Sequence, residues 1–401
     1  MKRFVRFLVL ILAISLSILF LPTAYAEETG TSAYDYMSQF VTQYKARGEK
    51  TDCTEYISAK FEAFGLDKIF EGSYTSDFSF VYSTFTLYSQ NVAAIKKSEN
   101  SNGTVIIGAG YDNLAGWSSS VTAEGAYSNG TGIGVLLALA EYLSTKDYGY
   151  DIVFVAFGAE QLGSCGSQYF VSQMSAEQID NTLLYVNLNK IGAGDKLYMY
   201  FDEVEREHGK LFSDVAAELE IDINSAPDDK KLMLINSNVS GLPYIHAMQN
   251  DALRVFYGQG INCAGFMSFN WDLEFVSYYQ ESANYANIAD TNEDTLVNLN
   301  AMYGDSVKDK MDSVVHLVSA TLANDGFADT MRASADNPPK ANDTLWIVLS
   351  AVLTSGLLAW GIYAFVIYRK TPPPPKHKNF TGANGSGSDK KDEKVFEEYG
   401  I

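Results

Sequence analysis

Hydrophobic and polar residues follow two different periods in the first part of the chain. Apolar residues at helical spacing predict a helix over residues 33–46, and a second helix is expected from residue 52 to residue 64, where Gly65 ends it. Apolar and polar residues then alternate in three short runs, which are residues 78–82, 84–88 and 91–95. Alternation of this kind predicts strands, and we expect these three to pair antiparallel.

From residue 104 onward, apolar runs of strand length alternate with helical segments. Strands are expected at residues 104–108, 152–157, 182–188, 197–201 and 262–269, and helices at residues 132–143, 175–181 and 294–322. This order predicts an α/β protein with a three-layer αβα domain, whose mixed, mostly parallel central sheet is covered on both faces. In such sheets the ligand site lies beyond the carboxyl ends of the strands, so we expect it at the loops that begin at Gly110, Glu160 and Asn189.

Both ends of the chain carry segments that differ from this domain. Residues 1–26 combine a basic start, an apolar core and a small-residue cleavage pattern, which predicts a signal peptide; an uncleaved anchor is the alternative. Residues 344–368 are uncharged, mostly apolar and long enough to form one C-terminal transmembrane helix, which needs about 20 residues. Basic residues follow, and they favour the cytoplasmic side. We therefore expect residues 27–343 to lie outside the cell membrane and residues 369–401 to form a disordered cytoplasmic tail.

Composition limits the classes of function. The formal net charge of −20 argues against nucleic-acid binding, which needs a basic surface, and against strong attachment of the domain to anionic lipid. The three cysteines, Cys53, Cys165 and Cys263, permit at most one disulfide, and their pairing stays open. The chain contains no Gly-x-Ser-x-Gly segment, so serine hydrolysis has little support.

A series of short motifs occurs at the ends of the expected strands. In chain order they are Asn91-Val92-Ala93-Ala94, Gly110-Tyr111-Asp112, Ala126-Tyr127-Ser128-Asn129-Gly130, Gly158-Ala159-Glu160-Gln161-Leu162-Gly163, Asn187-Leu188-Asn189-Lys190-Ile191-Gly192 and Asp290-Thr291-Asn292-Glu293-Asp294-Thr295. The series resembles the bacterial leucyl-aminopeptidase-like family of di-zinc exopeptidases, whose relatives include glutaminyl cyclases and transferrin-receptor-type domains. The resemblance covers residues 44–322 and implies a zinc-exopeptidase-like fold for nearly the whole domain.

The same resemblance implies where two zinc ions would be bound. The five ligand positions, which in the family hold His, a bridging Asp, Glu, Asp and His, are occupied here by Gly110, Ser128, Gln161, Asn189 and Asp290. Glu160 stands at the position of the general base, and Asp112 at the position that orients the first histidine. Two zinc ions bring four positive charges, which the family balances with carboxylates. The neutral side chains of Ser128, Gln161 and Asn189, which stand where the family has carboxylates, suit a pocket without zinc.

We therefore expect a membrane-anchored, peptidase-like pseudoenzyme that needs no cofactor and binds a peptide, an amino acid or a protein partner. Its binding residues would be the five ligand positions together with Asp112, while Glu160 would bind an amine or hold its loop. The alternative is an active metal-dependent aminopeptidase with atypical zinc ligands, among which His246 has a route to the site. A structural subunit of a membrane complex is a third possibility. His208, in a charged stretch, is expected on a solvated helix face.

Overall fold

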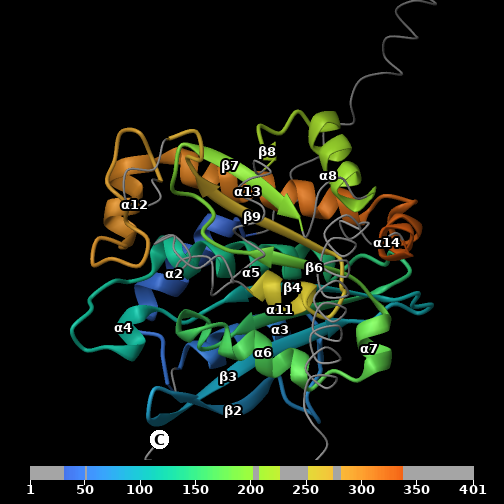
Figure 1. Ribbon diagram of the computed structural model, residues 1–401, viewed down its shortest axis with the longest axis horizontal. Coiled ribbons are helices and arrows are strands. Elements are labelled where there is room, and N and C mark those ends of the chain that lie inside the picture. The colour runs from blue at the N-terminus through green and yellow to red at the C-terminus, as the bar shows by residue number, and fades with distance from the viewer. Residues whose placement is uncertain (1–30, 50–51, 202–206, 226–251, 274–280, 337–401) are drawn as a thin grey trace, which may run out of the picture. The chain divides into compact units, whose positions relative to one another are not determined.

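The computed structural model describes residues 31–49, 52–201, 207–225, 252–273 and 281–336. These residues form one nine-stranded sheet with helices on both faces (Figure 1). The predicted signal peptide, transmembrane helix and tail lie outside the described residues, and so does His246. Within the described part of the chain, no helix is both long enough and apolar enough to cross a membrane.

The strands run in the order β1-β3-β5-β4-β6-β9-β7-β8, and β2 pairs with β3 beside this path. Their bounds are β1 Asp67–Lys68, β2 Thr75–Tyr82, β3 Phe85–Lys96, β4 Thr104–Gly110, β5 Asp151–Phe157, β6 Thr182–Leu188, β7 Lys196–Phe201, β8 Asn224–Ser225 and β9 Cys263–Phe269. The central strands β5, β4, β6 and β9 are parallel, whereas β3 joins β5 and β7 joins β9 antiparallel. The predicted mixed sheet with a mostly parallel centre is confirmed.

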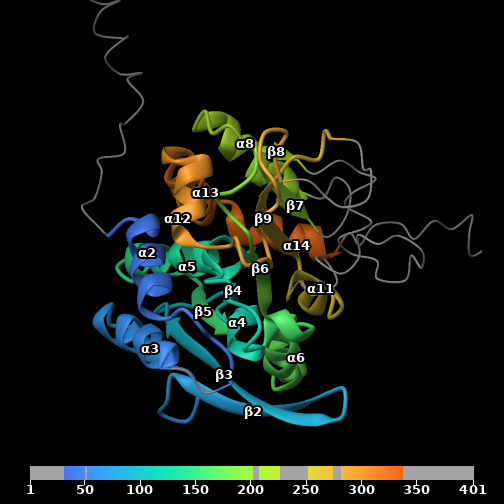
Figure 2. The ribbon, with the colours of Figure 1, turned by 90° about the vertical axis from the view of Figure 1, so that its left-hand side faces the viewer.

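The helices form a layer on each face of the sheet. The longer ones are α2 Ala33–Gln43, α3 Cys53–Ala63, α5 Thr131–Leu143, α6 Cys165–Ser172, α8 Glu207–Glu218, α12 Leu296–Tyr303, α13 Asp305–Leu322 and α14 Phe327–Asp336; the shorter ones are α4 Leu114–Trp117, α7 Ala176–Asp180 and α11 Ala252–Tyr257. Helices α2, α3, α5, α8, α13 and α14 share one apolar core with one face of the sheet, and α6 and α11 pack on the other face. Figure 2 shows α2, α3, α5 and α13 on one side of the strands and α6 and α11 on the other.

Alternation of side chains within each strand produces the two cores. In β5, Phe154 belongs to the core under α5, and its neighbours Val153 and Val155 belong to the core under α6 and α11. Successive residues of a strand point to opposite faces, so a strand covered on both faces must be apolar throughout. This requirement explains why the central strands were recognisable as continuous apolar runs.

Several predicted boundaries differ from the structure. The runs 84–88 and 91–95 form one strand, β3, because the intervening Ser89 and Gln90 continue the pairing with β2. The predicted closing helix is divided into α12 and α13 at Gly304, whose φ of 52° lies in the left-handed region. Asp52 is the N-cap residue of α3, but its side chain makes no capping hydrogen bond.

Candidate functional site

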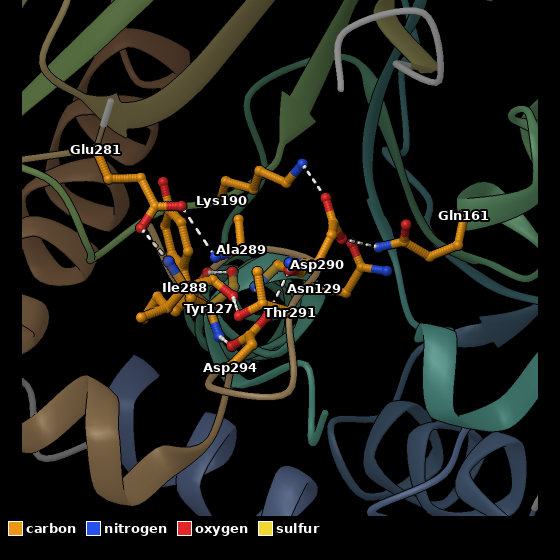
Figure 3. Close-up of polar contacts among 12 residues, drawn as sticks. Tyr127, Asn129, Gln161, Lys190, Glu281, Ile288, Ala289, Asp290, Thr291 and Asp294 are labelled. Atoms are coloured by element: carbon orange, nitrogen blue, oxygen red, sulfur yellow. Dashed lines mark hydrogen bonds and ion pairs between the residues drawn. The ribbon is translucent and has the colours of Figure 1, made fainter. Parts of the chain in front are cut away.

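The predicted site residues lie on loops at the carboxyl ends of β4, β5 and β6. Gly110 ends β4, Glu160 and Gln161 lie in the short turn η2 (Glu160–Leu162) after β5, and Asn189 follows β6. Two further segments meet these loops: the π-helical turn η1 (Ala126–Gly130), which contains Ser128, and the loop before α12, which contains Asp290. Figure 3 shows Gln161 and Asp290 of this group together with neighbouring residues of η1 and of the Asp290 loop.

Asp290 is held by two side chains from different strand ends. The Nζ atom of Lys190 lies 3.0 Å from Oδ2 of Asp290, and the Nε2 atom of Gln161 donates a hydrogen bond of 3.0 Å to Oδ1 (Figure 3). Burial opposes ionisation of Asp290, but the charge and the hydrogen bond of Lys190 outweigh it and hold the pKa of Asp290 below its usual range. Both partners of the ion pair have a positive φ, 53° for Lys190 and 57° for Asp290. Non-glycine residues rarely adopt this conformation, so the surrounding contacts must impose it.

Ser128 connects the Asp290 loop to a second buried carboxylate, Asp294. Asp294 accepts hydrogen bonds from the backbone N–H groups of Tyr127, at 2.7 Å, and Ser128, at 3.0 Å, and from the Ser128 hydroxyl. The same hydroxyl accepts the N–H of Asp290 at 3.0 Å. Burial raises the pKa of Asp294, although these hydrogen bonds favour its charged form. Ser128 is therefore part of the connection between η1 and the loop that precedes α12.

Asp112 binds the loop that contains Glu160 and Gln161. It accepts hydrogen bonds from the backbone N–H groups of Glu160, at 2.8 Å, and Gln161, at 3.1 Å, and from Nε1 of Trp117 at 2.8 Å. Burial raises its pKa to about 6 despite these donors. Glu160 in turn accepts the backbone N–H of Ser167 at 2.7 Å and the Ser167 hydroxyl at 3.2 Å. Both acids therefore serve as hydrogen-bond acceptors within the fold.

Gly110 and Asn189 complete the predicted set. A Cβ atom on Gly110 would lie 3.1 Å from Cβ and 3.2 Å from Cγ of Glu160, and 3.4 Å from Nδ2 of Asn129. A side chain at this position would therefore crowd Glu160, whose side chain would have to shift by a few tenths of an ångström. Asn189 is half-buried, and its backbone N–H donates to the carbonyl of Phe266 at 3.3 Å.

Two residues that sequence reasoning missed belong to this site. Lys190, which is buried, supplies a positive charge beside Asp290. Glu281, also buried, accepts the backbone N–H groups of Ile288 and Ala289, each at 2.9 Å, and so fixes the start of the Asp290 loop (Figure 3). Burial raises the pKa of Glu281 to about 7. Lys190 was detectable, because it is the only charged residue between positions 182 and 194.

Within the described residues, the five predicted ligand positions do not provide the donors of a di-zinc centre. Zinc is bound by imidazole, thiolate or carboxylate groups, and no group of three His, Cys, Asp or Glu side chains in the described ranges is arranged to hold a metal ion. Of the five predicted ligand positions, only Asp290 has an ionisable side chain, and its carboxylate is paired with the ammonium group of Lys190. The arrangement can hold the loops together and present amide and carboxylate groups to a ligand. The described residues do not form a ligand set for a metal ion that could activate water.

The fold and this set of loops define a class of protein. The fold is similar to that of a zinc aminopeptidase from Bacillus subtilis, with a TM-score of 0.53 and 16% sequence identity over 72% of this chain and 93% of that chain. At this level of identity the likeness shows a shared α/β fold. The profile of peptidase family M28 matches residues 91–309, which is more than half of the chain. The chain belongs to peptidase family M28.

Two curated relatives match shorter parts of the chain. Aminopeptidase YwaD of Bacillus subtilis is 34% identical over 106 residues, 26% of this chain and 22% of that protein. The BOS complex subunit NCLN of Gallus gallus is 27% identical over 166 residues, 38% of this chain and 28% of that protein. The matched part thus spans less than a third of the length of either relative.

Proposed function

We propose that this chain is a non-catalytic member of family M28, held outside the cell membrane by residues 344–368, which binds no zinc and binds a peptide, an amino acid or a protein partner. The observation that carries the proposal is the ion pair between Lys190 and Asp290, at 3.0 Å. By the resemblance, Asp290 stands where the family has a zinc-binding histidine. An internal ammonium group already supplies the positive charge at this position.

Charge balance supports a site without zinc. Two zinc ions would bring four positive charges to a site whose ligand positions supply one carboxylate, Asp290, and the nearby Lys190 would repel them. Asp112 and Glu160 are not among the five ligand positions, and each already accepts a backbone N–H group, so using their bound oxygens as substitute zinc ligands would compete with these hydrogen bonds. Each broken bond would leave a buried donor unsatisfied, which costs about 1–3 kcal/mol.

The comparisons are compatible with a binding role. The similarity to the chicken BOS complex subunit NCLN, a protein named as a subunit of a complex, supports a partner protein for this chain as well. The resemblance also suggests that the site binds a free amino terminus, the group that aminopeptidases recognise. Asp290 and Asp112 already have donors, so an incoming ammonium group would compete with Lys190 for Asp290.

Zinc stoichiometry tests the proposal most directly. The full chain, purified in a neutral detergent, would be incubated with excess zinc, desalted and analysed by plasma emission spectrometry. We expect a zinc content near zero. One or two tightly held ions per chain would overturn the proposal, and an unrelated zinc aminopeptidase treated in parallel would show that desalting leaves bound zinc in place.

Family membership favours a second candidate, an active metal-dependent aminopeptidase with atypical ligands such as His246. The two candidates differ in peptidase activity with zinc present. Under the proposal, hydrolysis of aminoacyl p-nitroanilides by the wild-type chain equals that of the Glu160→Gln variant. Activity that depends on Glu160 would instead establish the enzyme, because contaminating peptidases do not respond to this substitution.

A further inference from the structure

A two-stranded ribbon extends past the rest of the sheet. It consists of β2 and residues 85–91 of β3, and we call it the aromatic ribbon. Residues 75–82 pair with residues 85–92, but β3 pairs with β5 only from Val92 onward. No described strand pairs with β2 on the side away from β3. Figure 2 shows the ribbon along the lower border of the domain, with β2 outermost.

Both faces of the aromatic ribbon carry exposed apolar side chains. Of the exposed large hydrophobic side chains in the described ranges, four lie here: Val81, Tyr82, Phe85 and Tyr88. Because strand neighbours alternate and Tyr88 pairs with Ser79, Val81 and Tyr88 share one face, whereas the pair Tyr82 and Phe85 shares the other. No charged residue and no proline occurs from Phe78 to Ile95, in a chain of net charge −20.

The ribbon is fixed to the domain near the candidate site. Phe78 stacks on Tyr169 of α6 with ring centroids 5.0 Å apart, and Phe80 meets Trp117 of α4 edge-to-face at 6.0 Å. Trp117 is the residue whose indole donates to Asp112. A ribbon held in this way presents its free strand edge in one orientation, which lowers the entropic cost of binding.

We infer that the aromatic ribbon is a docking site for an extended, apolar segment of another polypeptide, which adds to the sheet along the free edge of β2. Asp77 is the charged residue of β2, and Nε2 of Gln90 donates a hydrogen bond to its carboxylate. From Phe78 to Tyr82 the free edge has no charge and no proline, and such an edge is a template for pairing that natural proteins cover or block. Strand addition uses backbone hydrogen bonds for affinity and alternate side chains for specificity. Val81 and Tyr82 would supply apolar contacts on the two faces of the added strand.

Two other occupants fit the ribbon less well. Lipid offers no regular donors and acceptors, so an open strand edge in hydrocarbon would leave its backbone groups unsatisfied. A second copy of the chain would bring a further net charge of −20, and repulsion between the copies opposes association. A neutral or basic polypeptide segment has neither disadvantage. The inference rests on the proposed binding role, but the ribbon lies outside the predicted zinc positions.

The test uses a defined strand as the probe. A blocked, dye-labelled peptide with the sequence of residues 84–92, the segment that pairs with β2 on its inner side, is titrated with the full chain in neutral detergent. We expect saturable binding by fluorescence anisotropy and slower amide hydrogen exchange along β2. The Val81→Lys substitution should weaken binding about tenfold, because it adds charge at the edge. A peptide with prolines in place of two central residues should not bind.

The control is Val297→Lys on α12. Val81 is 73% exposed and Val297 75% exposed, so both lysines lie in solvent and only the position differs. Absence of saturable binding at millimolar peptide, or equal weakening by both substitutions, would overturn the inference.

A dimer in light scattering that Val81→Lys dissociates would assign the ribbon to a second copy instead. Quenching of the indole introduced by Phe85→Trp with brominated phosphatidylcholine in nanodiscs would assign it to lipid. Zinc uptake would overturn the proposed function and leave the peptide result unaffected.

Discussion

Replacing Lys190 by methionine removes the cation from the candidate site while keeping most of the side-chain volume. At 3.0 Å and an effective dielectric constant of about 20, the attraction between Lys190 and Asp290 is on the order of 5 kcal/mol before desolvation is subtracted. Breaking a buried pair by removing one partner costs about 3–5 kcal/mol. The side chain of Lys190 is 6% exposed, but that of Asp290 is 25% exposed, so solvent screens part of the loss. We expect Lys190→Met to lower the free energy of unfolding by about 2–3 kcal/mol at neutral pH.

The pH dependence separates lost charge pairing from lost packing. In the wild type the pKa of Asp290 is lowered, so its contribution is present above the unfolded pKa and is lost only as the pH falls through the folded pKa. Without Lys190, burial remains and should raise the pKa of Asp290 above its unfolded value. The variant should then regain stability as the pH falls from about 7 to about 5, and its deficit should shrink.

Urea denaturation at both pH values measures this deficit. Lys210→Met is the matched control, because Lys210 pairs with Asp214 on an exposed helix face, where such pairs contribute at most about 0.5 kcal/mol. The double variant Lys190→Met/Asp290→Asn removes the stranded carboxylate and should recover part of the loss. The reasoning is refuted if Lys190→Met costs no more than Lys210→Met, or if its deficit is the same at both pH values.

Two further predictions concern the buried acids around the Asp290 loop. Asp294→Asn should lower the free energy of unfolding by about 2–3 kcal/mol, because an amide nitrogen cannot accept the hydrogen bonds that Tyr127 and Ser128 donate. Urea denaturation measures this loss. An unchanged denaturation midpoint would contradict the assigned contacts. Burial raises the pKa of Glu281 to about 7, so its contribution to stability is full below the unfolded pKa and is lost as the pH rises through the folded pKa. The wild type should lose on the order of 2–3 kcal/mol between about pH 5 and about pH 8, and Glu281→Gln should show a flatter profile; equal profiles would exclude Glu281 as the titrating group.

Much of the fold was predictable because both faces of the central strands are buried. A strand such as β5 must then be apolar at nearly every position, and this pattern can be read without knowledge of its neighbours. His208 shows where the argument fails. Its charged surroundings predicted a solvated helix face, and this was wrong: the side chain is buried, with Nε2 3.2 Å from the carbonyl of Cys263. A single charged stretch does not say which face of a helix meets the sheet.

The candidate site was predictable only as far as strand ends indicate it. Gly110, Glu160 and Asn189 were located because each follows a buried strand, and the structure places them on neighbouring loops. The partners of these residues were not predictable from spacing, since Lys190 and Asp290 are separated by 100 residues and meet only when β6 and the loop before α12 are in place.

The hydrogen bonds of the remaining acids explain how the loops keep their shape without relying on a metal. In a di-zinc site the carboxylate oxygens bind metal, and the metals tie the strand-end loops together. Here Asp112 accepts two backbone N–H groups of the loop after β5, Asp294 accepts two from η1, and Glu281 accepts two from the start of the Asp290 loop. Each acid thus holds one loop by direct hydrogen bonds, and Lys190 supplies a positive charge beside Asp290, the carboxylate among the predicted ligand positions. The loops that carry catalysis in a zinc peptidase can therefore persist as a fixed surface beside the aromatic ribbon.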